Sequence, residues 1–143
     1  MSGKEQPAQG RIEDGLHRLP VRVYYEDTDF TGVVYYANYL RYIERARSDW
    51  VRSLGVDQNA MREKDGVVFV VRRVEADYLK PAKFDDELLV RTVVKAVTGV
   101  RLIMSQEVIR GDDLLFQAEV TVVCIGEGGV PARLPANIRR RIH

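Results

Sequence analysis

The chain has 143 residues, the length of one domain of common size and too few for two ordinary ones. Its 45% hydrophobic and 30% charged residues are typical of a globular protein with a substantial core. The 22 Lys and Arg residues nearly balance the 21 Asp and Glu residues, so the net charge does not indicate a nucleic-acid partner or a membrane-surface protein. No apolar segment is long enough to span a bilayer, and no stable membrane insertion is expected.

Cysteine usage bears on the compartment. Cys124 is the only cysteine, so no intrachain disulfide can form, and the N-terminus lacks the apolar core of a signal peptide. We therefore expect a cytoplasmic protein. We interpret Cys124 as a small buried hydrophobic residue, because the two histidines, His17 and His143, lie near the termini and outside the predicted folded pattern.

The N-terminal part of the chain is polar. Residues 1–18 show no apolar periodicity, so we expect a flexible tail followed by one folded domain over residues 19–143. The first predicted strand covers residues 21–25, in which the apolar side chains alternate with others. An acidic turn follows at residues 26–32 and ends in Gly32.

One long helix is predicted over residues 36–54. Its apolar side chains recur every three or four residues, the pattern of a helix with one buried face. They are Leu40, Ile43, Trp50, Val51 and Leu54. Gly55 is well placed to end the helix in a left-handed conformation.

Only strand patterns follow the helix, apart from a short helical start at residues 135–137. The predicted strands cover residues 67–78, 88–97, 100–109 and 116–122. Short turns between consecutive strands imply a mainly antiparallel sheet, against which the single helix must bury its apolar face. The sequence thus predicts an α+β fold, a curved antiparallel five-stranded sheet wrapped around one long central helix.

Residues 27–32 match the first half of a calcium-binding loop. Such a loop needs a bidentate Glu at its twelfth position, where this chain has Asn38, and a strand rather than a helix precedes it. The sequence also lacks a Cys/His cluster, a glycine-rich phosphate loop and a nucleophile elbow. We therefore expect no metal and no cofactor.

Asp29 lies where the first predicted strand leads into the helix. The first N–H groups of a helix have no intrahelical partner and carry the positive end of its dipole. They can polarise a carbonyl while a nearby carboxylate attacks it or deprotonates a water. The alternative is that Asp29 only caps the helix or a turn. The residues alone leave both interpretations open.

Residues 22–39, RVYYEDTDFTGVVYYANY, resemble the signature of the 4-hydroxybenzoyl-CoA thioesterase family. The following YIERAR, residues 42–47, is similar to the YbgC-type branch of that family, which is associated with the Tol-Pal system. The likeness covers about residues 19–140. It continues through residues 69–73, 81–86, 118–120 and 133–135.

The resemblance implies a hotdog fold that hydrolyses acyl-CoA thioesters without a metal, as a homodimer or homotetramer with sites between subunits. It implies a catalytic aspartate at Asp29, as nucleophile or general base, and a backbone N–H at Tyr36 that polarises the thioester carbonyl. Substrate contacts are implied at Gly32, Val33 and Arg101. Arg101 is the one charge that matches the basic run by which the hydroxybenzoyl branch binds the nucleotide phosphates.

The predicted function is therefore that of an acyl-CoA thioesterase, with an acyl carrier protein thioester as a further candidate substrate. A hotdog dehydratase would need a catalytic histidine with an acidic partner, and the two histidines of this chain lie outside the predicted folded pattern. The YbgC branch often has His where this chain has Tyr36, so an imidazole has no role at that position. The alternative from another class is a non-catalytic hotdog module that binds acyl-CoA or a protein partner of the Tol-Pal system. Asp29 argues against it, because a binding module needs no carboxylate facing a thioester.

Other candidate residues have simpler interpretations. Glu44 is expected to pair with neighbouring arginines on the helix. Asp27 is expected to face away from Asp29 and to be much less sensitive to replacement. The tyrosines of the helix and its approach are expected to be packing or interface residues, or less simply an acyl-pocket wall. They are Tyr35, Tyr39 and Tyr42.

Overall fold

The computed structural model describes residues 5–142; residues 1–4 of the predicted tail and His143 lie outside this range. Its elements, in chain order, are β1 (Arg11–Glu13), β2 (Leu16–Arg22), the 3₁₀ turn η1 (Tyr25–Asp27), α1 (Asn38–Ser53), α2 (Gln58–Ala60), the π-helical turn η2 (Met61–Asp65), β3 (Val68–Tyr78), β4 (Glu87–Val97), β5 (Arg101–Arg110), β6 (Asp113–Ile125), η3 (Glu127–Gly129) and α3 (Ala136–Ile142). Within residues 5–142, no helix is long and apolar enough to cross a membrane.

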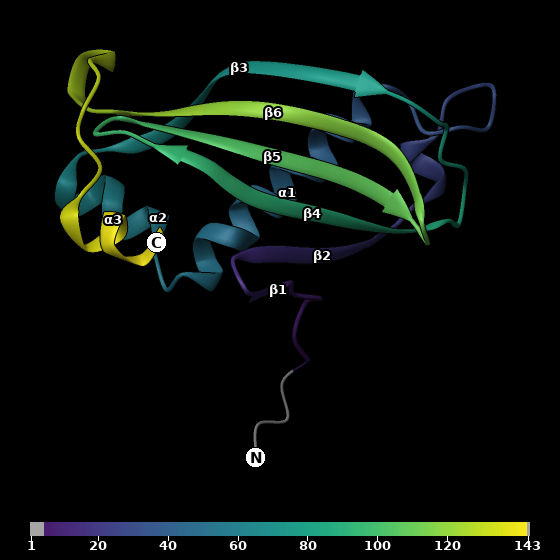
Figure 1. Ribbon diagram of the computed structural model, residues 1–143, viewed down its shortest axis with the longest axis horizontal. Coiled ribbons are helices and arrows are strands. Elements are labelled where there is room, and N and C mark those ends of the chain that lie inside the picture. The colour runs from purple at the N-terminus through teal and green to yellow at the C-terminus, as the bar shows by residue number, and fades with distance from the viewer. Residues whose placement is uncertain (1–4, 143) are drawn as a thin grey trace.

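The strands form one antiparallel sheet in the order β1-β2-β4-β5-β6-β3. The sheet curves around α1, which runs along its inner face, while α2 and α3 lie together at one end (Figure 1). The predicted α+β architecture with one long helix is confirmed, but the sheet has six strands instead of five.

The extra strand corrects the predicted N-terminal tail. Residues 11–18 form β1 and the start of β2, so the expectation of a flexible segment is wrong for them. The two strands are joined by Asp14 and Gly15, both with positive φ (52° and 78°), as a two-residue hairpin loop requires. β1 has only three residues, too few for apolar periodicity to reveal it.

Helix α1 begins two residues later than predicted, at Asn38, and ends at Ser53. Gly55 has φ 80° and ends the helix as expected. The buried face of α1 includes Tyr42, Ile43 and Trp50, which pack against the inward-facing side chains of the sheet. On β5 buried residues alternate with partly exposed ones, so this strand gives one face to the core.

Candidate active site

A tight hairpin joins η1 to α1. The N–H of Asp29 donates to the carbonyl oxygen of Val33 at 2.9 Å, and the N–H of Tyr35 donates to that of Asp27, also at 2.9 Å. The N–H of Gly32 donates to the carbonyl oxygen of Asp29 at 3.0 Å, and Gly32 has φ 83°. This is a three-residue hairpin loop that closes with a left-handed residue. We call this segment, residues 27–35, the site hairpin.

The carboxylate of Asp29 is exposed on the site hairpin. Its Oδ1 accepts hydrogen bonds from the hydroxyl of Thr31 at 2.5 Å and from the backbone N–H of Thr31 at 2.8 Å. The hydroxyl bond first, and then the backbone bond, hold the pKa of Asp29 below its ordinary value. Asp29 is therefore ionised at neutral pH. Among residues 5–142, no donor forms a hydrogen bond with its Oδ2.

Tyr36 follows the site hairpin directly and precedes α1. Its carbonyl oxygen accepts a hydrogen bond from the hydroxyl of Tyr78 at 3.0 Å, which ties it to the end of β3. In the described part of the chain its backbone N–H donates to no protein acceptor. Ala37, at the cap position of α1, supplies no side-chain hydrogen bond either. The entrance to α1 thus leaves an unpaired donor close to Asp29 in the chain.

Asp27 has the opposite environment to Asp29, and the expected smaller effect of its replacement on turnover stays a prediction. Its carboxylate is buried; one oxygen accepts a hydrogen bond from the Tyr24 N–H at 2.8 Å and the other accepts one from the side-chain amide of Asn38 at 2.7 Å. The hydroxyl of Tyr42 also faces this carboxylate, and burial together with that charge raises the pKa of Tyr42. Asp27 therefore holds η1, the site hairpin and α1 together.

The segment between β3 and β4 supports the site hairpin from outside. The N–H of Val34 donates to the carbonyl oxygen of Ala82 at 2.8 Å, and the N–H of Ala82 donates to the hydroxyl of Tyr39 at 3.0 Å. Arg110 holds the same segment through Asp86 at 2.8 Å. Sequence reasoning missed these supports, because each joins residues far apart in the chain.

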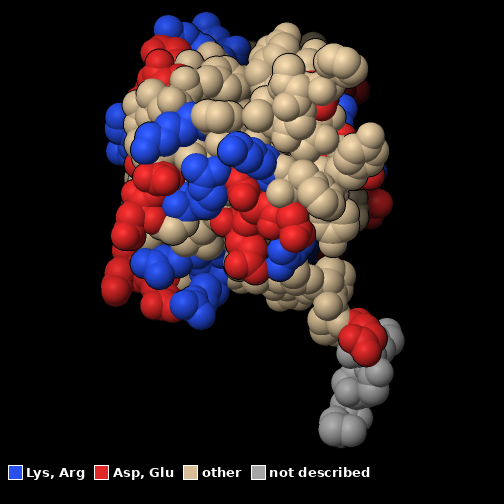
Figure 2. Space-filling model, turned by 90° about the vertical axis from the view of Figure 1, so that its right-hand side faces the viewer, with Lys and Arg blue, Asp and Glu red and all other residues tan. Residues whose placement is uncertain are grey.

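Exposed aromatic residues surround the site hairpin. Rings of Tyr35 and Tyr36 lie 4.9 Å apart between centroids, and Tyr36 meets Tyr78 at 6.2 Å. Phe30 is fully exposed at the tip of the hairpin. Figure 2 shows this end of the molecule, where uncharged side chains form a continuous area in the upper right beside charges of both signs. The exposed aromatic rings are suited to cover a ligand or a second protein surface.

The structure brings some of the predicted site residues together and separates others. Asp29, Gly32, Val33 and Tyr36 all lie on the site hairpin or its exit into α1. Gly32 is required there by its positive φ, and the space where its Cβ would lie is open. Contacts of Gly32 and Val33 with substrate stay predictions.

Arg101 lies at the other end of the sheet from the site hairpin. It begins β5 beside the end of β4, while the start of β4 adjoins the segment that supports the hairpin. The length of β4 separates the two ends by roughly 33 Å at 3.3 Å per residue. Two further arginines flank the turn before Arg101. Arg133 lies over Gly99, and Arg139 donates to the carbonyl oxygen of Thr98 at 3.3 Å.

His17 corrects the expectation that the histidines lie outside the fold. It is fully buried in β2, and its Nε2 bonds to Oδ2 of Asp49 on α1 at 2.7 Å. The same oxygen accepts the Gly10 N–H at 2.9 Å, so Asp49 fastens the N-terminal segment to the helix. The enclosed imidazole has no access to a substrate. Within residues 5–142, no three His, Cys, Asp or Glu side chains are arranged to hold a metal ion.

Comparison with known proteins identifies the family. The sequence model of the thioesterase-like superfamily matches residues 23–142. The chain belongs to this superfamily. It is 41% identical over 131 residues to a Haemophilus influenzae protein named acyl-CoA thioesterase YbgC, with 91% of this chain and 96% of that protein covered.

Solved structures of this superfamily agree with the fold. A probable thioesterase from Bartonella henselae is 38% identical and superposes with a TM-score of 0.80, covering 84% of this chain and 99% of that one. A mutant 4-hydroxybenzoyl-CoA thioesterase in complex with 4-hydroxybenzoyl-CoA superposes with a TM-score of 0.85 over 90% of this chain and 99% of its own, at 21% identity, which bears on the fold alone. The predicted family, hotdog fold and thioesterase activity are confirmed.

Proposed function

We propose that this chain hydrolyses acyl-CoA thioesters to a free acid and CoA, with Asp29 as the catalytic carboxylate and the Tyr36 N–H as the donor to the thioester carbonyl. One observation carries the proposal: an exposed, ionised carboxylate lies on the site hairpin, and an unpaired backbone donor lies at the exit of that hairpin into α1. The names of the relatives supply the substrate class. The single cysteine, free and buried, fits a reducing cytoplasm.

The chemistry follows from these two groups. A hydrogen bond from the Tyr36 N–H stabilises the negative charge that develops on the carbonyl oxygen. Asp29 then acts in one of two ways. As a nucleophile it attacks the carbonyl carbon, CoA leaves as the thiolate, and water hydrolyses the acyl-aspartyl anhydride. As a general base it takes a proton from the water that attacks the carbon. Both routes consume one water and need Asp29 ionised.

A homodimer formed through β3 is the second part of the proposal. β3 is an edge strand of eleven residues with one unpaired side, and its Val71, Val74 and Tyr78 are exposed. Long unpaired edges of this kind are templates for pairing with another strand. In the antiparallel register that places Val74 opposite its own copy, Arg73 lies opposite Glu75 of the partner subunit, so opposite charges meet twice.

Such pairing would also explain how Arg101, at the far end of its own sheet, can reach a substrate bound at a site hairpin. A two-fold axis across β3 joins the sheets of two copies and turns one by 180° relative to the other. The Arg101 end of the partner subunit then lies on the same side as the site hairpin. We propose that Arg101, with Arg133 and Arg139 beside it, approaches the phosphates of the CoA bound at the partner's hairpin.

Replacing Val74 by lysine tests the dimer, because two like charges would meet at the axis. We expect the Val74→Lys protein to be monomeric by light scattering, while wild type has at least twice the mass of the chain. Val130→Lys is the control, since Val130 is also exposed but lies outside β3. Wild type that runs only as the 16.3 kDa species would contradict the dimer.

The activity is tested by following thiol release from a panel of short, long and aromatic acyl-CoAs, with an acyl carrier protein thioester as a separate arm. We expect thiol release at a rate well above that in buffer alone for at least one acyl-CoA. Buffer-level rates for every thioester would contradict the proposal and favour a non-catalytic module that binds acyl-CoA or a protein partner.

A further inference from the structure

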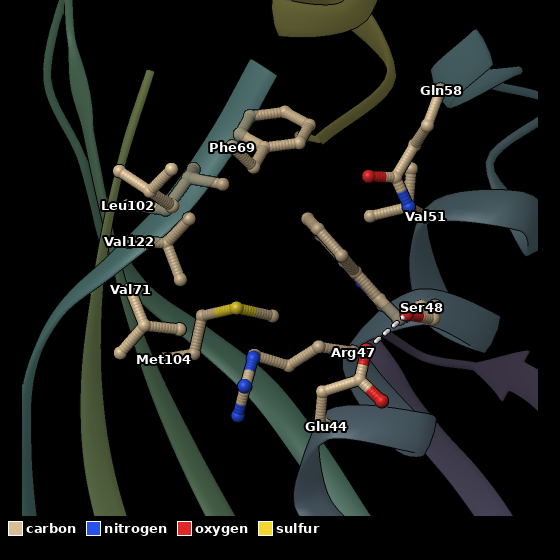
Figure 3. A pocket seen from close by; sticks show the side chains of 12 residues that line it. Glu44, Arg47, Ser48, Val51, Gln58, Phe69, Val71, Leu102, Met104 and Val122 are labelled. Carbon is tan, nitrogen blue, oxygen red and sulfur yellow. Dashed lines mark hydrogen bonds between the residues drawn. The ribbon is translucent and has the colours of Figure 1, made fainter. Parts of the chain in front are cut away.

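A crevice lies between α1 and the β3 side of the sheet, apart from the site hairpin. It encloses about 130 Å³, and Figure 3 shows side chains of α1 on one side facing those of the strands on the other. Its walls are mainly apolar and include Trp50, Phe69, Val71, Leu102, Met104 and Val122. Polar groups enter it only from the α1 side, where Glu44, Arg47 and Ser48 lie, and from Gln58.

Arg47 is the unusual residue of this crevice. Its side chain is half-buried, and Nη1 donates to the side-chain oxygen of Gln106 at 2.9 Å. Gln106 is itself fixed, because its Nε2 donates to the carbonyl oxygen of Ile43 and to the hydroxyl of Thr92, both at 2.9 Å. This neutral amide therefore orients a charged guanidinium group.

Among residues 5–142, no carboxylate lies within ion-pair distance of that charge, and Glu44 stabilises it only from farther away. In the described part of the chain Arg47 forms no ion pair, and Glu44, the nearest acid on the helix, accepts a hydrogen bond from Ser48 at 2.9 Å instead. The predicted pairing of Glu44 with arginine is therefore not found. A partly buried cation without an acid partner in contact is costly, and a guanidinium group has five N–H donors. Donors of Arg47 not used by Gln106 remain for a ligand in the crevice.

Within one chain the crevice is distant from the reacting groups. Arg47 lies nine residues beyond the start of α1, about 14 Å along the helix at 1.5 Å per residue. The proposed β3 pairing removes that distance. With Val74 on the axis, Val70 at the crevice wall lies opposite Tyr78 of the partner subunit, the residue that holds Tyr36. The crevice of one copy then adjoins the site hairpin of the other.

We propose that this crevice holds the acyl group of a thioester bound at the partner's site hairpin, and that Arg47 selects acyl groups with an oxygen acceptor at their far end. The inference rests on the proposed function. A volume of about 130 Å³ is slightly smaller than a 150 Å³ apolar cavity that binds benzene, so the acyl group is a short branched chain or a single ring. Its acceptor is a hydroxyl or carboxylate oxygen.

Pairs of substrates that differ only by hydroxyl in place of methyl test the selection. We would compare 3-hydroxybutanoyl-CoA with isovaleryl-CoA, and 4-hydroxybenzoyl-CoA with 4-methylbenzoyl-CoA. Wild type is expected to favour the hydroxyl member of at least one pair in kcat/KM by roughly tenfold, the value of a hydrogen bond to a charged group. Arg47→Met should abolish that preference. Arg45→Met, an exposed arginine on the same helix, should retain it.

A preference that is absent in wild type, or that persists in Arg47→Met, would overturn the role of Arg47. Wild type inactive on every thioester would instead contradict the proposed function itself. A second experiment tests where the acyl group binds, even if Arg47→Met does not fold. Ser48→Trp should block the mouth of the crevice and inactivate the enzyme. Asp29→Asn should also inactivate the enzyme, because it removes the catalytic carboxylate of the site hairpin.

Mixed dimers of these two folded, inactive variants have one intact site only if hairpin and crevice come from different copies. Random exchange of subunits should then restore about a quarter of wild-type activity, since half of the dimers are mixed and each has one working site. No recovery in mixtures shown to exchange subunits would place both elements in one copy, or the acyl group elsewhere, and would overturn the proposal.

Discussion

The buried carboxylate of Asp27 accepts a hydrogen bond from the side-chain amide of Asn38 at 2.7 Å, and this contact ties the site hairpin to the first turn of α1. The other oxygen of the same carboxylate accepts the N–H of Tyr24 at 2.8 Å. Both oxygens face donors, so an asparagine at position 27 would place the NH₂ group of its amide against one of those donors.

Asp27→Asn is therefore expected to destabilise the fold by about 2 kcal/mol, the value of a buried hydrogen bond to a charged group. Chemical denaturation should show a lower midpoint with an unchanged slope. Asp57→Asn is the matched control: Asp57 is an exposed N-cap that accepts the N–H of Asn59 at 2.9 Å, and asparagine caps equally well. Equal midpoints for the two variants would contradict the structural role of Asp27.

Acid pH should reveal the hydrogen bond between Thr31 and Asp29. The bond lowers the pKa of Asp29, so the active, ionised form persists to a lower pH than that of an ordinary aspartate. Thr31→Val keeps the shape but removes the hydroxyl, and the pKa of Asp29 should rise. The acid limb of kcat/KM against pH is then expected to move to higher pH, with both proteins alike near neutrality. An acid limb at the same pH in both proteins would show that this limb does not report the ionisation of Asp29.

The buried pair of His17 and Asp49 should contribute to stability and not to turnover. Asp49→Ala leaves the imidazole of His17 and the N–H of Gly10 without their acceptor, which is expected to cost about 3 kcal/mol. In a double-mutant cycle with His17→Leu, the second replacement should cost less than it does in wild type. Additive losses in urea denaturation would show that the two side chains do not interact.

Arg101→Ala tests the phosphate contact across the dimer. Arg101 is partly buried, and removal of a charge that meets phosphate should raise KM and weaken its dependence on salt, with kcat nearly unchanged. Arg62→Ala is a suitable control, because Arg62 is exposed in η2. Wild-type KM and salt dependence in Arg101→Ala would place the nucleotide elsewhere.

Periodicity in the sequence was enough to predict most of the fold. The apolar spacing of α1 and the alternation along β5 and β6 each reflect burial of one face, which is a local property of the sequence. β1 was missed because three residues show no period, although the Asp14-Gly15 pair is a hairpin signal. The burial of His17 depends on Asp49, 32 residues away, and no local pattern indicates it.

The candidate site was predicted in part. Resemblance indicated Asp29 and Tyr36, and both lie on the site hairpin or its exit. Asp27 and Asp29 look alike in the sequence, yet one is buried and the other exposed, because the hairpin turns their side chains into different surroundings. The separation of Arg101 from Asp29 was predictable: successive antiparallel strands place the β4–β5 turn at the end opposite the start of β4.

The most direct test of the account is kcat for thiol release by Asp29→Asn. Asparagine preserves the shape and can still accept the hydrogen bonds of Thr31, but it can neither deprotonate water nor form an anhydride. We predict that kcat falls at least ~10²-fold while folding, oligomeric state and acyl-CoA binding persist, and that Asp57→Asn turns over like wild type. A fully active Asp29→Asn enzyme would contradict the central assignment and leave Asp29 as a residue of the turn.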